Sequence, residues 1–171
     1  MFQRTDYSQA SITQMVSALG NGEVTALQLT EFALERIDQY DRRLHAISRV
    51  FATEARTAAT ASDLRRSAGF PGGKLEGIPL LIKDNIGVRG WPLTAGSVAL
   101  QGLIAREDAP LVARLREEGA ILLGQTAMHE LAAGITGASS LTGYTENIFH
   151  MGYSPGGSSS GSAVAVAAGY T

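Results

Sequence analysis

Residues 77–85, GIPLLIKDN, decide the fold because an unbroken apolar run leads directly into a lysine. A run such as 79–82 is typical of a strand that is buried on both faces. A second run at 120–124, AILLG, predicts another buried strand. Helical patterns stand before, between and after the two strands. This order predicts an α/β fold in which helices are layered on a sheet.

The segment before the first buried strand, residues 1–70, carries amphipathic and alanine-rich patterns that predict a helical layer, with the core starting after it. Serine and threonine at the start of two of these patterns favour N-caps. The expected elements are helices over 8–20, 25–42 and 52–67, a strand over 46–50, and N-caps at Ser8 and Thr25.

The segment 71–171 holds the two buried strands and three further helical patterns. Residues 133–157 are rich in Gly, Ser and Thr, and a loop of this length inside a compact domain is usually functional. The expected helices begin after Asp108 and end at Glu118, begin after Thr126 and end at Leu131, and follow the serines at 158–160.

Composition narrows the possible functions. The 171 residues are 44% hydrophobic and 18% charged, with a formal net charge of −2, which indicates a globular domain and argues against a nucleic-acid partner. The absence of cysteine excludes disulfides and thiol catalysis. The N-terminus lacks an apolar signal region and no apolar run could span a bilayer, so we expect a cytoplasmic protein without a membrane partner. No metal site is expected, because His45, His129 and His150 lie far apart in the sequence.

Lys83 closes the first buried strand. A lysine at a strand end commonly packs its stem and leaves its ammonium in water. In a low-dielectric setting the charged form is disfavoured, the pKa falls, and the neutral amine can serve as a base. A serine hydroxyl needs such a base to become a nucleophile. The position alone leaves both interpretations open.

Residues 153–169, YSPGGSSSGSAVAVAAG, place three consecutive serines directly before an apolar helical pattern. A flexible linker does not fit that apolar flank, and an N-cap explains only one hydroxyl. The spacing of Gly156 and Gly161 matches a phosphate-binding P-loop, but Ser162 and Ala163 stand where that motif requires Lys and Ser/Thr. The remaining interpretation is a loop that approaches a substrate or another side chain closely.

Taken together, GIPLLIKDNI at 77–86 and PGGSSSGSAVAVAAG at 155–169 resemble the amidase signature family of amidohydrolases. The segments between them agree in order, with TAGS at 94–97 and EDAPLVARLREEGAILLGQTAMHELAAG at 107–134. The resemblance implies an α/β/α layered fold with a mixed central sheet, of which this chain holds the N-terminal part. It also implies hydrolysis of a small-molecule amide by a Ser–cis-Ser–Lys triad, with no cofactor and no metal.

The resemblance assigns roles to residues of both motifs. Lys83 is implied as the base, and Ser158 as the cis-serine that relays a proton between lysine and nucleophile. Ser159 is expected to support this network. The expected loop glycines are Gly134, Gly156 and Gly157.

The resemblance also places the acylating serine and the oxyanion hole beyond residue 171. We therefore expect 1–70 and 71–171 to be a helical layer and the first part of the core within one incomplete amidase domain, inactive alone and partnered by the C-terminal part. A homodimer is left open. The alternative is a non-catalytic binding or scaffold module with the same partial fold.

Three local features qualify the resemblance. The loop reads GGSSSGS where the family commonly has GGSSGGS, and Asn147-Ile148 stands where Asn-Pro is frequent. The stretch MHELAAGITG at 128–137 is more similar to free-standing amidases than to the amidotransferase component that acts on aminoacyl-tRNA.

Overall fold

A three-stranded sheet lies at the centre of the computed structural model, which describes residues 6–70 and 72–171. The strands are β1 (Ile47–Val50), β2 (Pro79–Lys83) and β3 (Ile121–Thr126), in the order β1–β3–β2. β2 is parallel to β3 and β1 is antiparallel to it, so the sheet is mixed, as predicted.

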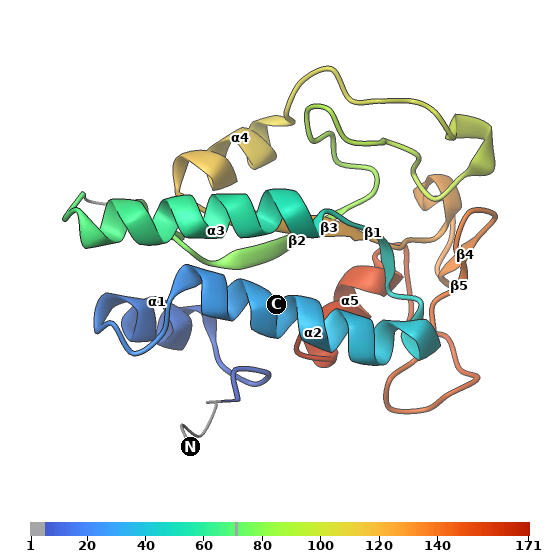
Figure 1. Ribbon diagram of the computed structural model, residues 1–171. Coiled ribbons are helices and arrows are strands. Elements are labelled where there is room, and N and C mark those ends of the chain that lie inside the picture. Colours follow the sequence, from blue (N-terminus) through green and yellow to red (C-terminus); the bar gives the residue numbers. More distant parts are fainter. Residues whose placement is uncertain (1–5, 71) are drawn as a thin grey trace.

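Helices surround this sheet, and α2 and α3 lie side by side (Figure 1). Along the described residues, no helix is both long and apolar enough to cross a bilayer. The helices are α1 (Ile12–Gly20), α2 (Ala26–Leu44), α3 (Ala52–Ser67), α4 (Pro110–Glu117) and α5 (Ser160–Ala167), with 3-10 turns η1 (Val98–Leu100) and η2 (Glu130–Ala132) and a small hairpin of β4 (Ala138–Ser139) and β5 (Gly143–Tyr144).

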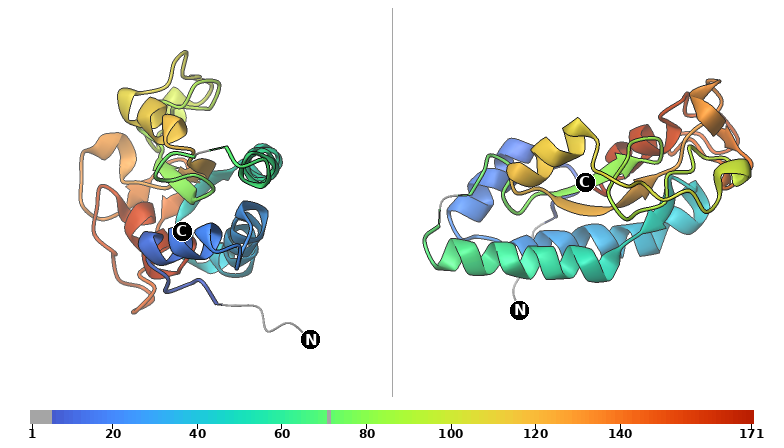
Figure 2. Two further views of the ribbon diagram at one scale, coloured as in Figure 1. Left: turned by 90° about the vertical axis from the view of Figure 1, so that its left-hand side faces the viewer. Right: turned by 90° about the horizontal axis from the view of Figure 1, so that it is seen from above.

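Both faces of the sheet are covered by apolar side chains. Neighbouring residues of β3 point to opposite faces, so Ile121 and Leu123 enter one hydrophobic cluster and Leu122 enters another. The smaller cluster contains Val112 of α4 and Trp91. The larger one draws on α1, α2, α3 and α5, so the core begins within the first 70 residues and not after them as expected. Figure 2 shows α4 and α2 on different sides of the strands.

The pairing of β2 with β3 decides which residues meet at the end of the sheet. An irregularity between Leu80 and Leu81 shifts the register, and Lys83 then lies opposite Thr126. Because parallel strands end at the same edge, Lys83 and the segment that follows β3 emerge together.

The N-caps of the first two helices follow from local sequence. Thr25 caps α2 as predicted, and Gln28 completes a capping box with it. The prediction of Ser8 as the first N-cap is wrong. Ser11 caps α1 instead, because Ser11 and Gln14 exchange the two hydrogen bonds of a capping box.

Two further helix starts differ from the prediction. Thr126 is the last residue of β3 and caps no helix; its hydroxyl lies 2.8 Å from Ser162 Oγ. Ala109 is the N-cap of α4, while the carboxylate of Asp108 accepts a hydrogen bond from the Arg89 N–H at 2.7 Å. The predicted strand at 46–50 and helix at 52–67 are confirmed.

Gly124 of β3 lies where the neighbouring strand leaves no room for a side chain. A Cβ there would overlap the carbonyl oxygen of Arg49 and lie 3.0 Å from the Cα of Val50. We expect Gly124→Ala to lower the free energy of unfolding of the full-length protein by about 1–3 kcal/mol, because backbone atoms cannot turn aside. Chemical denaturation measures this change.

Gly20→Ala is the matched control, because nothing lies within 4 Å of its Cβ position. We expect this variant to be as stable as the wild type or slightly more stable. An equal loss of stability in both variants would contradict the steric explanation.

Candidate active site

Lys83 and Ser158 meet at the edge of the sheet where β2 and β3 end. The Nζ of Lys83 donates a hydrogen bond to Ser158 Oγ at 2.7 Å, although the two residues are 75 positions apart in the sequence. Both residues are half-buried. The structure therefore brings together the two side chains to which the resemblance assigns proton transfer.

Backbone contacts to the segment after β3 hold the serine loop in place. The N–H of His129 donates to the Ser158 carbonyl oxygen at 3.0 Å, and the N–H of Gly161 donates to that of Ala127 at 3.0 Å. A Cβ on Gly161 would lie 2.5 Å from Ala127 O and would overlap Ala46 O. The loop is thus aligned by the continuation of β3, the strand that also aligns β2.

The glycines before Ser158 allow a second loop to approach closely. A Cβ on Gly157 would lie 3.0 Å from the carbonyl carbon of Ile135. Gly156 has a φ of 88°, which side-chain-bearing residues rarely adopt. The peptide bond between Gly157 and Ser158 is cis, in agreement with the resemblance. Both glycines therefore serve the backbone geometry next to Ser158.

The two other expected site residues lie beside this pair. Ser159 is exposed and its side chain makes no capping hydrogen bond to α5. Gly134 packs against the ring of His129, which a Cβ would overlap, and His129 Nδ1 lies 3.2 Å from Thr136 Oγ1. The supporting roles of Ser159 and Gly134 stay predictions.

Burial lowers the pKa of the Lys83 amine below the usual value for a lysine. Desolvation is the cause, because the surrounding protein disfavours the ammonium more than the neutral amine. A larger fraction of neutral amine makes Lys83 a better proton acceptor at a given pH.

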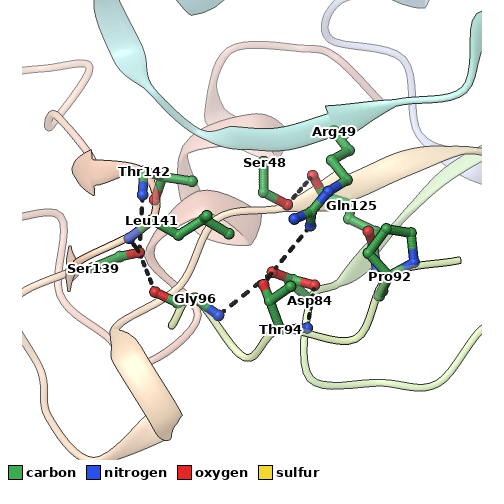
Figure 3. A network of polar contacts seen from close by, with 10 residues as sticks. All are labelled: Ser48, Arg49, Asp84, Pro92, Thr94, Gly96, Gln125, Ser139, Leu141 and Thr142. Carbon is green, nitrogen blue, oxygen red and sulfur yellow. Dashed lines mark hydrogen bonds and ion pairs between the residues drawn. The ribbon is translucent and has the colours of Figure 1, made fainter. Parts of the chain in front are cut away.

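Sequence analysis missed Asp84, which follows Lys83 directly. Its carboxylate is fully buried and accepts hydrogen bonds from Thr94 and Gly96, and it forms an ion pair with Arg49 (Figure 3). The available signal was a charged residue immediately after a buried strand, since carboxylates are almost never fully buried without partners.

A cavity of about 250 Å³ lies beside the serine loop. Ser154 connects its wall to that loop, because Ser154 Oγ donates to Thr136 O at 3.0 Å and accepts from the Gly156 N–H at 3.1 Å. Aromatic and polar side chains together are typical of a small-molecule subsite. The lining residues are Thr136, Tyr144, Thr145, Glu146, Gly152, Tyr153 and Ser154.

The mixed sheet and the helices that cover it form a fold that is found in solved amidase structures. The Amidase family model matches residues 28–171. This chain therefore belongs to the amidase family.

Two bacterial relatives are both components of glutamyl-tRNA(Gln) amidotransferase. That of Salinispora arenicola is 40% identical over 164 residues, which are 96% of this chain and 33% of that protein. That of Halorhodospira halophila is 42% identical over 160 residues, which are 94% of this chain and 33% of that protein.

Solved structures of amidases have the same fold as this chain. The peptide amidase from Stenotrophomonas maltophilia has a TM-score of 0.91 and 41% identity, over 96% of this chain and 35% of that one. A structure of fatty acid amide hydrolase, at 23% identity and a TM-score of 0.91, shares the fold. The chain spans about a third of the length of these relatives. Since the identity is similar for the amidase and the amidotransferase components, the expected likeness to free-standing amidases stays a prediction.

The lowered pKa of Lys83 can be measured by acetylation followed by peptide mass spectrometry. Of the two lysines in these 171 residues, Lys74 is exposed and serves as the reference for active reagent. We expect acetylation of Lys83 in the full-length protein to reach half its maximal rate at a lower pH than acetylation of free lysine does, because burial disfavours the ammonium. A midpoint equal to or above that of free lysine would contradict the lowered pKa.

Proposed function

We propose that the protein cleaves small-molecule carboxylic amides by nucleophilic acyl transfer, with Lys83 as the base and Ser158 as the proton relay. The observation that carries this proposal is the 2.7 Å contact between Lys83 Nζ and Ser158 Oγ, at a lysine whose pKa burial lowers. Membership of the amidase family and the similarity to a peptide amidase support the same class of reaction.

In the proposed reaction, the neutral amine of Lys83 takes the hydroxyl proton of Ser158, which takes the proton of the nucleophilic serine. The serine oxygen then bonds to the amide carbonyl carbon. As the carbon–nitrogen bond breaks, the relay returns a proton to the leaving amine, and water releases the acyl group in a second cycle.

The acylating serine and the oxyanion-hole amides belong, in this proposal, to the part of the protein that follows residue 171. Residues 1–70 and 71–171 form one amidase domain with that C-terminal part, and neither cofactor nor metal takes part. The proposal includes a cytoplasmic location and leaves a homodimer open.

A second candidate function is amide cleavage that feeds an amide transfer. The observation that favours it is the 42% identity to the glutamyl-tRNA(Gln) amidotransferase component of Halorhodospira halophila. Ammonia release that requires both a partner protein and an acceptor substrate would support transfer. Ammonia release by the purified protein alone supports simple hydrolysis.

Lys83→Met removes the amine and keeps an unbranched side chain. We expect this variant of the full-length protein to release ammonia from a primary aryl amide about a thousandfold more slowly, because a general base typically contributes on the order of 10²–10⁴ in rate. Ser158→Ala should lose a similar factor, because the relay between base and nucleophile is cut.

Lys74→Met is the matched control, since Lys74 is exposed, and should retain wild-type turnover. Wild-type rates in Lys83→Met would exclude the proposed base. A folded full-length protein that cleaves no member of a panel of aryl and aliphatic amides would favour the non-catalytic scaffold instead.

A further inference from the structure

Asp84 is fully buried, and each of its polar groups forms a hydrogen bond with another segment of the chain. Its N–H donates to the Thr126 carbonyl oxygen on β3 at 3.3 Å, and its own carbonyl oxygen accepts from the Ala95 N–H at 3.0 Å. The carboxylate accepts from the Thr94 N–H at 3.2 Å, from the Thr94 hydroxyl, and from the Gly96 N–H at 3.4 Å. One residue therefore connects the end of β2 to both β3 and the turn at 94–97.

The turn at 94–97 is shaped around this carboxylate. Ala95 has a φ of 47° and Gly96 a φ of 72°, so two consecutive residues are left-handed, and Ala95 does so against the steric preference of its side chain. Successive N–H groups in a turn of this kind can converge on one anion. Figure 3 shows Thr94 and Gly96 on one side of the Asp84 carboxylate.

Arg49 approaches the same carboxylate from β1, the opposite edge strand. Its Nη1 lies 3.5 Å from Asp84 Oδ2, and its side chain is 23% exposed while that of Asp84 is fully buried. A buried carboxylate requires a counter-charge and hydrogen-bond donors. Through Arg49, Asp84 ties the strand end of Lys83 to β1 as well.

The turn is also bonded on its far side, away from Asp84. Ser139 Oγ of the hairpin donates to the Gly96 carbonyl oxygen at 2.5 Å (Figure 3). Ser97 Oγ donates to Glu130 at 2.6 Å. The turn is therefore a fixed support against which Asp84 can hold the backbone that follows β2.

Lys83 is the last residue of β2, so its backbone is held on one side by the pairing with Thr126 of β3 and on the other by the chain that begins with Asp84. We propose that Asp84 is the positioning residue for Lys83, holding its backbone so that the amine stays within hydrogen-bond distance of Ser158 Oγ. The effect on turnover rests on the proposed function. The placement of the Lys83 amine rests on the geometry alone.

Two pairs of variants in the full-length protein test this role. Asp84→Asn removes the charge and part of the acceptor capacity, and Asp108→Asn is its control. Asp108 also accepts a backbone hydrogen bond, from Arg89, and pairs with an arginine, with Arg116 Nε at 3.0 Å, but it lies in the chain before α4.

Thr94→Val is the second test, because it removes the hydroxyl that donates to the Asp84 carboxylate and changes no charge. Thr30→Val is its control: both threonines are fully buried, and within the described part of the chain the Thr30 hydroxyl has no hydrogen-bond partner. This pair keeps the test decisive if Asp84→Asn fails to fold.

The first readout is turnover of a primary aryl amide per folded molecule. We expect kcat to fall by about a hundredfold in Asp84→Asn, and by a smaller factor in Thr94→Val, with KM nearly unchanged, because a displacement near 1 Å can cost that much. Both controls should keep wild-type kcat. A fall in folded fraction alone, with wild-type kcat per folded molecule, would show that Asp84 only stabilises the fold.

The second readout needs no turnover. The pH at which acetylation of Lys83 reaches half its maximal rate should rise toward that of free lysine in Asp84→Asn and Thr94→Val, because an amine that leaves Ser158 for solvent loses the desolvation that lowers its pKa. This midpoint should stay constant in both controls. An unchanged midpoint in folded Asp84→Asn and Thr94→Val would overturn the proposal. If the wild type cleaves no amide, this midpoint alone still decides whether Asp84 holds Lys83, so failure of the proposed function is recognised separately.

Discussion

The parallel pairing of β2 with β3 is the contact on which the candidate site depends. It sets Lys83 opposite Thr126, so both strands end at the same edge of the sheet. The chain after β3 then carries the backbone groups of residues 127 and 129 that bind the serine loop. A register shift by one residue would turn Lys83 to the other face of the sheet and separate it from Ser158.

Close backbone approach makes this arrangement possible. Gly124 allows the backbone of β1 to pack closely against β3. Gly161 allows the first turn of α5 to pack against the carbonyl groups of Ala46 and Ala127. At both positions the contact is between main chains, and one extra carbon would occupy the space of an oxygen atom. The small residues of the serine loop therefore have a packing reason that is independent of any chemistry of the hydroxyls.

The sequence predicted correctly those elements that depend on neighbouring residues. It failed where an element or a side chain is held by contacts between distant segments. The helix at 52–67 and the N-cap Thr25 depend on neighbours within one or two turns, and both are confirmed. Thr126 was mistaken for a helix start because its place in the sheet depends on pairing with β2. The 2.7 Å contact of Lys83 with Ser158 agrees with the family resemblance. Asp84 was missed because its partners come from three separate segments.

The bond from the His129 N–H to the Ser158 carbonyl oxygen is made by main-chain atoms on both sides. Any residue except proline supplies the same donor, so the alignment of Ser158 does not require a particular side chain at position 129. In the segment that continues to residue 137, the exposed side chain of Ile135 can also change in size and polarity, whereas Gly134 and Gly137 leave no room for a Cβ. Substitution at such an exposed position would change the surface beside the candidate site and leave the main-chain contacts that hold Ser158 in place.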